Sequence, residues 1–204
     1  MGPLEAACVG LLLIAPAQAG HPPQGSSSTT VEIVIPTPEP RRFELALDEI
    51  ELDWTEAGRA EGKEPPAPAS VPGTKILGHE RQRTRIRVEA AKTLEALEKA
   101  LAETLTANPG ARGEIVVFEA GQPRTAAHRQ LLTSDVALIL NDGALVENVL
   151  ARAKVTRGEV VEAPGGYVIR CETPLAAVDA ARHLGTLEGV KHAYPLLKRA
   201  RATR

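Results

Sequence analysis

The stretch from Thr133 to Lys198 constrains the fold most, because β-rich and helical segments alternate along it. Apolar and other residues alternate in SDVALILND, where Val136, Leu138 and Leu140 share one face, and this pattern predicts a strand. A turn signal follows at Asp142-Gly143, and the segment GALVENVLARAKV then carries apolar residues at helical spacing. The stretch therefore opens with a strand and a helix.

The rest of this stretch predicts a hairpin, a second helix and a last strand. The segments GEVVEAP and GGYVIRCET are β-rich and meet at Pro164-Gly165-Gly166, which is typical of a hairpin turn. Thr173-Pro174 has the form of an N-cap followed by proline in the first helical position, and Gly189 ends the helix. A strand over Val190–Leu197 completes the order β-α-β-β-α-β, which predicts a ferredoxin-like unit over residues 133–200. Its core is expected to contain Leu138, Val149, Val178 and Leu184.

A smaller α/β region is predicted ahead of this unit, over residues 41–124, so the fold class is α+β. The segment from Phe43 to Trp54 alternates with a slip near Asp48-Glu49, which indicates a strand with a bulge. The clearest helix spans Thr93–Thr106, with Thr93 as its N-cap. A buried strand follows at Glu114–Glu119.

Composition narrows the function classes. A formal net charge of −2 and a hydrophobic content of 43% fit one or two small domains with an aliphatic core. The segment Arg81–Arg87 contains four arginines, which fits either a nucleic-acid patch or the solvated face of a strand. We expect the strand face and no nucleic-acid binding, because the charge is near neutral and base stacking needs more aromatic side chains.

The first 40 residues look like a targeting segment and a linker. Residues 1–19 have a short apolar stretch followed by Ala17-Gln18-Ala19, which is typical of a secretory signal peptide with cleavage after Ala19. A disordered alanine-rich start is the alternative. The apolar stretch is too short to span a membrane, so we expect a secreted or periplasmic protein without membrane association after cleavage. Residues 20–40 are rich in Pro, Ser and Thr and predict a flexible linker.

A resemblance is carried by the segment that follows the second helix. It reads Leu187-Glu188-Gly189-Val190-Lys191-His192-Ala193-Tyr194-Pro195 and runs into a basic segment. With the order of elements, residues 133–204 resemble the propeptide of secreted subtilisin/kexin-like serine proteases, although this family often has an acidic residue where Tyr194 stands. The resemblance implies an intramolecular chaperone and inhibitor that docks its sheet on two helices of the catalytic domain.

Two groups of residues would carry this function. With helices on one sheet face only, Ala137 and Ile139 point to the opposite face, and we assign His192 and Tyr194 to the same partner-binding surface. Residues 198–204 are interpreted as a basic tail that lies outside the core and enters the protease cleft. The residues assigned to processing in this tail are the dibasic pair Lys198-Arg199 and the pair Arg201 and Arg204. A frayed, solvated tail is the alternative.

Motifs for catalysis are missing from the sequence. Subtilisin-like catalysis needs Asp-Ser/Thr-Gly, His-Gly-Thr and Gly-Thr-Ser-x-Ala/Ser, and none of these is present. The histidines lack metal spacing, and no glycine-rich phosphate loop exists. We therefore expect a non-catalytic region with no cofactor and no metal, followed in the precursor by a catalytic domain. Its expected partner is the catalytic domain of a subtilisin-like protease, in cis or in trans. The alternative is a stand-alone secreted ferredoxin-like binding module or protease inhibitor.

Overall fold

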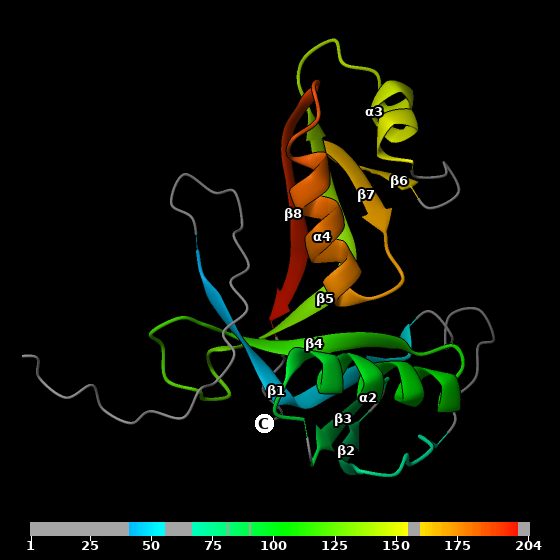
Figure 1. Ribbon diagram of the computed structural model, residues 1–204, viewed down its shortest axis with the longest axis vertical. Helices are drawn as coiled ribbons and strands as arrows, with labels where there is room; N and C mark the ends of the chain where they lie inside the picture. Colours follow the sequence, from blue (N-terminus) through cyan, green and yellow to red (C-terminus); the bar gives the residue numbers. More distant parts are fainter. Residues whose placement is uncertain (1–40, 56–66, 81, 90, 155–159, 200–204) are drawn as a thin grey trace, which may run out of the picture.

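The protein is a mixed α+β protein whose helices pack on one antiparallel sheet (Figure 1). The computed structural model describes residues 41–55, 67–80, 82–89, 91–154 and 160–199, and within them there are eight strands and three helices. The predicted signal peptide with Ala17 and Ala19, the linker over residues 20–40, and Arg201 and Arg204 lie outside the described residues.

The first half of the sheet has the strand order β2-β3-β1-β4. Its elements are β1 (Phe43–Asp53), β2 (Thr74–Glu80), β3 (Arg83–Val88), α2 (Leu94–Ala107) and β4 (Arg112–Glu119). As predicted, Thr93 caps α2, and its side chain accepts a hydrogen bond from the backbone N–H of Ala96 at 3.2 Å. The register between β1 and β4 shifts between Leu45 and Ile50, which confirms the predicted bulge.

The second half follows the predicted sequence of elements. They are β5 (Arg129–Leu140), α3 (Val146–Ala153), β6 (Val160–Ala163), β7 (Gly166–Arg170), α4 (Pro174–Leu184) and β8 (Val190–Arg199). The strands pair antiparallel in the order β8-β5-β7-β6. Strands β6 and β7 form the predicted hairpin, with Gly165 in its turn at a φ of 81°, a conformation that glycine adopts without strain. Thr173 caps α4 and accepts a hydrogen bond from the N–H of Ala176.

Strands β5 and β8 belong to both halves. Leu132, near the start of β5, lies opposite Ile115 of β4, whereas Val136 lies opposite Ile169 of β7. On the other edge of β5, β8 pairs with the strand over nearly its whole length, and Figure 1 shows both strands rising from β4. The expected boundary between residues 41–124 and 133–200 is therefore crossed by one continuous sheet, and β5 begins at Arg129 rather than near Thr133.

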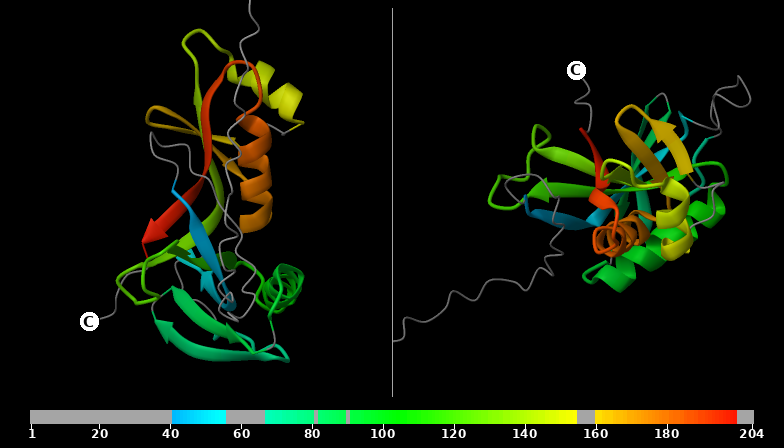
Figure 2. Two further views of the ribbon diagram at one scale, coloured as in Figure 1. Left: turned by 60° about the vertical axis from the view of Figure 1, so that its left-hand side comes forward. Right: turned by 90° about the horizontal axis from the view of Figure 1, so that it is seen from above.

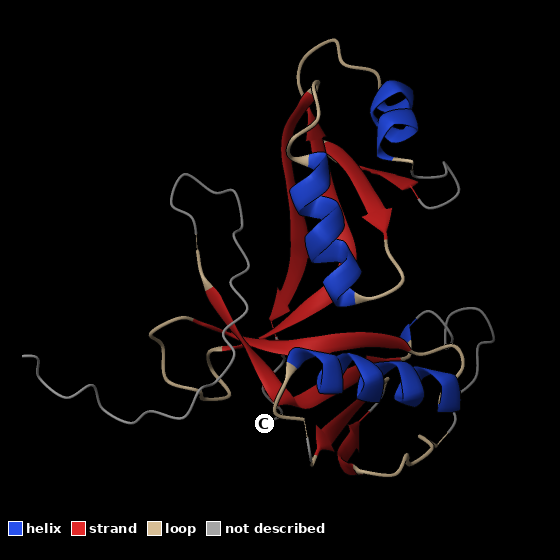
Figure 3. Ribbon diagram, viewed as in Figure 1, coloured by secondary structure: helices blue, strands red, loops and turns tan. Residues whose placement is uncertain are grey.

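The helices gather on one side of this sheet, as both views in Figure 2 and the helix colouring in Figure 3 show. One core cluster lies under α2 and a second under α3 and α4. The predicted core residues Leu138, Val149 and Leu184 share the second cluster. Val178 belongs to the first cluster instead, because the beginning of α4 contacts β4. Helix α4 thus ties the two halves together.

Candidate interaction site

The four residues predicted to bind a partner form two neighbouring cross-strand pairs. Ala137 of β5 lies opposite Tyr194 of β8, and Ile139 lies opposite His192. Residues directly opposite one another in an antiparallel pair project from the same face of the sheet. The residues of β5 that alternate with Ala137 and Ile139 point into the core under the helices. Ala137 and Ile139 therefore point to the face that the helices leave uncovered.

The register extends this uncovered face across two further strands. Val168 of β7 lies opposite Ala137, and Val161 of β6 lies opposite Val168. Val161 is 54% exposed, a high value for a branched aliphatic side chain in a strand, while Val168 is half-buried. We call this surface the open face; it comprises Ala137, Ile139, Val161, Val168, His192 and Tyr194. An apolar row thus crosses four strands.

Tyr194 is less available to a partner than the sequence interpretation assumed. Its side chain is half-buried and packs against the core cluster of the first half of the sheet. His192, two residues earlier in β8, is exposed. Tyr194 therefore contributes to the packing that joins β8 to the first half, and the accessible part of the open face centres on Ile139, His192 and the two valines.

A charged group borders the open face toward the first half of the sheet. Asp135 of β5 lies opposite Arg170 of β7, with 3.9 Å between its carboxylate and the Arg170 Nε. Nη2 of Arg112 donates to this carboxylate at 2.6 Å and to the hydroxyl of Ser134 at 2.7 Å. These contacts hold Arg112 of β4 against the neighbouring strand β5, and the charged group limits the apolar row at this end.

The basic residues at the end of β8 are not a free tail, so the predicted start of the tail at Lys198 is wrong. Lys198 lies opposite Leu131 of β5, and Arg199 lies opposite Gln130. Nζ of Lys198 donates to carboxylates in β1 and β4, whereas Arg199 is exposed at the strand end. The structure separates the two members of the predicted dibasic pair, because one is held by the fold and the other faces solvent.

Lys198 belongs to a charge network on the sheet face opposite α2. In register, Glu49, Glu51 and Asp53 of β1 lie opposite Arg87, Arg85 and Arg83 of β3. Strands β4, β5 and β8 each add one residue to the network, namely Glu114, Arg129 and Lys198. The carboxylates are the buried members, with Glu51 3%, Asp53 6% and Glu114 2% exposed. Buried carboxylates need partners, and the surrounding cations supply them.

The contacts in the network are short and shared. The Arg83 guanidinium lies 2.7 Å from Glu51, 3.2 Å from Glu114 and 3.4 Å from Asp53. The Lys198 ammonium lies 2.7 Å from Glu114 and 3.1 Å from Asp53. Two cations, from strands on either side of β1 and β4, therefore hold the same two carboxylates.

Burial and neighbouring hydrogen-bond partners together shift the pKa values of Glu114, Asp53 and Lys198 in different directions. Burial raises the pKa of Glu114, and the charges of Lys198 and Arg83 offset this only in part. Burial also acts to raise the pKa of Asp53, but hydrogen bonds from Thr55 and Lys198 outweigh it and hold that pKa below its usual range. For Lys198, burial lowers the pKa, yet the bonds to Glu114 and Asp53 prevail and raise it.

A comparison with known proteins found no matching family model, no matching curated protein and no matching solved structure.

The network was missed by sequence reasoning, although the sequence carries its signal. Acidic residues recur with period two in the strand that ends at Asp53, and arginines recur with period two from Arg83 to Arg87. Matching alternation of opposite charges is typical of neighbouring strands, because charges directly opposite one another stabilise the pair. The same pattern could have placed β3 beside β1. Nothing in the local sequence indicates that Lys198 joins them, since that contact depends on the sheet order.

A shallow depression of about 210 Å³ is lined by Arg41, Glu119, Ala127, His128, Gln130 and Arg199. Arg41 donates to Glu119 at 3.0 and 2.6 Å, which lowers the pKa of the Glu119 carboxyl.

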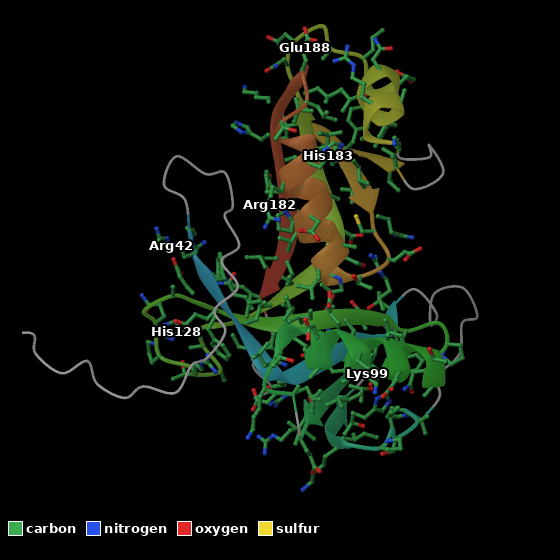
Figure 4. The ribbon with its side chains drawn as sticks, viewed as in Figure 1. Arg42, Lys99, His128, Arg182, His183 and Glu188 are labelled. Atoms are coloured by element: carbon green, nitrogen blue, oxygen red, sulfur yellow. The ribbon has the colours of Figure 1, made fainter. Side chains whose placement is uncertain are left out.

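Figure 4 shows His128 in the loop before β5 and His183 on α4, well apart. The described residues contain no group of His, Cys, Asp and Glu arranged for a metal ion. Among the described helices, none combines the length and apolar character that crossing a bilayer requires.

Proposed function

We propose that residues 129–199 form a ferredoxin-like, propeptide-type domain that binds and inhibits a subtilisin-like serine endopeptidase and assists its folding. The antiparallel order β8-β5-β7-β6, together with helices on one side, supports the ferredoxin-like assignment. The domain supplies no catalytic group in this proposal. Its resemblance to the subtilisin/kexin propeptides supports export through residues 1–19 and action outside the cytoplasm.

One observation supports the proposal most: a four-stranded sheet presents an apolar row on the face without helices. Isolated apolar side chains on a surface are ordinary, but a contiguous row across neighbouring strands is typical of a binding surface. The row runs from Val161 through Val168 to Ala137, with Ile139 beside it. The family resemblance gives two helices of a catalytic domain as the partner. Such a partner fits the open face, because a flat apolar sheet face packs against amphipathic helices.

The proposal is tested by measuring inhibition constants with purified protein. The assay uses secreted subtilisin-like endopeptidases, including the one encoded nearest to this chain, and a chymotrypsin-like endopeptidase as a specificity control. Val161→Asp on the open face should weaken inhibition of the subtilisin-like enzyme about tenfold or more, since it places a charge in a desolvated interface. Leu145→Asp is the matched control, because Leu145 is a 61% exposed aliphatic residue at the N-cap of α3, outside the open face.

Three outcomes decide the matter. Selective inhibition by the wild type that Val161→Asp weakens and Leu145→Asp leaves unchanged supports the proposal. Equal inhibition by all three proteins contradicts the assignment of the open face. A wild-type protein that inhibits none of the subtilisin-like enzymes contradicts the proposed function and favours the stand-alone binding module.

A further inference from the structure

The side chain of Lys198 contacts residues on two strands, β4 and β1, that do not pair with its own strand β8. The strand order places β5 between β8 and β4, and β4 between β5 and β1. The Lys198 side chain nevertheless reaches Glu114 of β4 and Asp53 of β1. The end of β8 is thus attached to the first half of the sheet by a side chain that passes across β5.

Both carboxylates that hold Lys198 are removed from solvent. Glu114 is 2% and Asp53 is 6% exposed, and their only other cationic partner among the described residues is Arg83, at 3.2 and 3.4 Å. The Lys198 ammonium makes the shorter contact with each of them, at 2.7 and 3.1 Å. Lys198 therefore completes a site that β1, β3 and β4 build.

We propose that Lys198 is an anchor that fixes the end of β8 to residues 41–119, and that the Lys198-Arg199 pair is not a processing site in the folded protein. A protease cleaves a paired strand only after the strand opens locally, so its rate follows the population of the open form. Lys198 and Arg199 are both paired with β5, and the ion pairs of Lys198 oppose that opening. The first half of the sheet thereby holds the end of β8 in place.

This inference also deepens the proposed function and in that part rests on it. An inhibitory segment must enter the protease cleft in one register, and its register depends on where the preceding strand ends. Lys198 is then a positioning residue for residues 200–204, which follow β8 in the sequence. Residues 41–119 act in inhibition through Lys198 without having to touch the protease themselves.

The first experiment measures anchoring directly by trypsin digestion of the full chain, with the cleavage rate after Arg199 followed by mass spectrometry. The test variant combines Asp53→Asn and Glu114→Gln, and Lys198→Met removes the other partner. Each should speed cleavage after Arg199 by about tenfold or more, because the free energy of local opening falls. Cleavage after Arg170, at the end of β7, reports on global unfolding and should speed up much less than cleavage after Arg199.

Two further variants control this experiment. Glu44→Gln removes the partner of Arg124 in an exposed ion pair on the same strand β1 and should leave both rates unchanged. Lys198→Arg retains a cation and should stay protected. Acceleration by the same factor after Arg199 and after Arg170 would show general destabilisation and overturn the anchor. The anchor would also be overturned if the wild-type protein were cleaved after Arg199 as fast as a free peptide of residues 190–204.

The second experiment measures the inhibition constant for the subtilisin-like endopeptidase with the same variants. The Asp53→Asn and Glu114→Gln combination should weaken inhibition about tenfold, at a temperature where circular dichroism shows it folded, and Lys198→Arg should retain inhibition. Unchanged inhibition alongside faster cleavage after Arg199 would leave the anchor standing and overturn its role in positioning. A wild-type protein without inhibitory activity would overturn the proposed function, while the trypsin experiment would still decide the anchor.

Discussion

Arg129 at the start of β5 donates to Glu51 of β1 at 2.7 Å, although β4 lies between the two strands. Its second amino group donates to Glu49 at 2.8 Å. The Arg129 side chain is 10% exposed and that of Glu51 4%. Together with Lys198, Arg129 makes the face opposite α2 a charged layer that connects five strands. The two long strands are thus joined to the first half by ion pairs on one face and by α4 on the other.

Arg129→Met should destabilise the protein by about 3 kcal/mol, because it leaves two carboxylates without their shared buried partner. Arg85→Met is the control, since Arg85 also pairs with Glu49 but is 51% exposed, and exposed pairs contribute about 0–1 kcal/mol. Urea unfolding of both variants measures the difference. Equal losses of unfolding free energy would contradict the view that burial gives this contact its importance.

Leu138→Ala and Leu184→Ala should each cost about 2–5 kcal/mol in the free energy of unfolding, because each leaves a cavity between the sheet and α4. Both side chains are almost completely buried in the same core cluster. Leu145→Ala, at a 61% exposed position, should change stability little. If chemical denaturation found either buried substitution silent, the packing of α4 on β5 would be wrong.

The sequence was most informative where local patterns suffice. The alternation that contains Leu138, the cap at Thr173 and the helix at Thr93 each predicted an element that the structure contains, because period and capping are local properties. The contacts of Lys198 could not be predicted from such local patterns. A basic residue at a strand end looks like a solvated tail until the sheet order brings buried carboxylates beside it. The membership of Val178 in the first core likewise depends on how α4 crosses β4.

The stability contributed by Lys198 should disappear at high pH. Its pKa is raised in the folded state because the carboxylates of Glu114 and Asp53 outweigh the effect of burial. A raised pKa means that the contribution is fully present below the unfolded value of about 10.4 and is lost as the pH rises through the folded value. The difference in urea midpoint between the wild type and Lys198→Met should therefore be constant near neutral pH and shrink at strongly alkaline pH. A difference that grows with alkaline pH would contradict the sign of this linkage.

Gly166→Ala should destabilise the hairpin of β6 and β7. A Cβ at this position would clash with the carbonyl oxygen of Leu138, so the backbone of β5 or β7 must shift. We expect a cost of about 1–3 kcal/mol, as for other overpacked positions. Gly78→Ala in β2 is the control, because a Cβ there meets no heavy atom within 4 Å. Comparable thermal midpoints for the two variants would contradict the close approach of β7 to β5.

Deletions at the C-terminus should separate the fold from the proposed inhibitory segment. Removing residues 198–204 takes away two paired residues of β8 and both ion pairs of Lys198, so it should lower the thermal midpoint as well as inhibition. Removing residues 200–204 leaves every described contact in place, so it should lower inhibition of the subtilisin-like endopeptidase without changing the midpoint. Calorimetry and inhibition constants for both deletions give the comparison. If the shorter deletion retained full inhibition, binding would depend on the open face alone and the C-terminal segment would have no part in it.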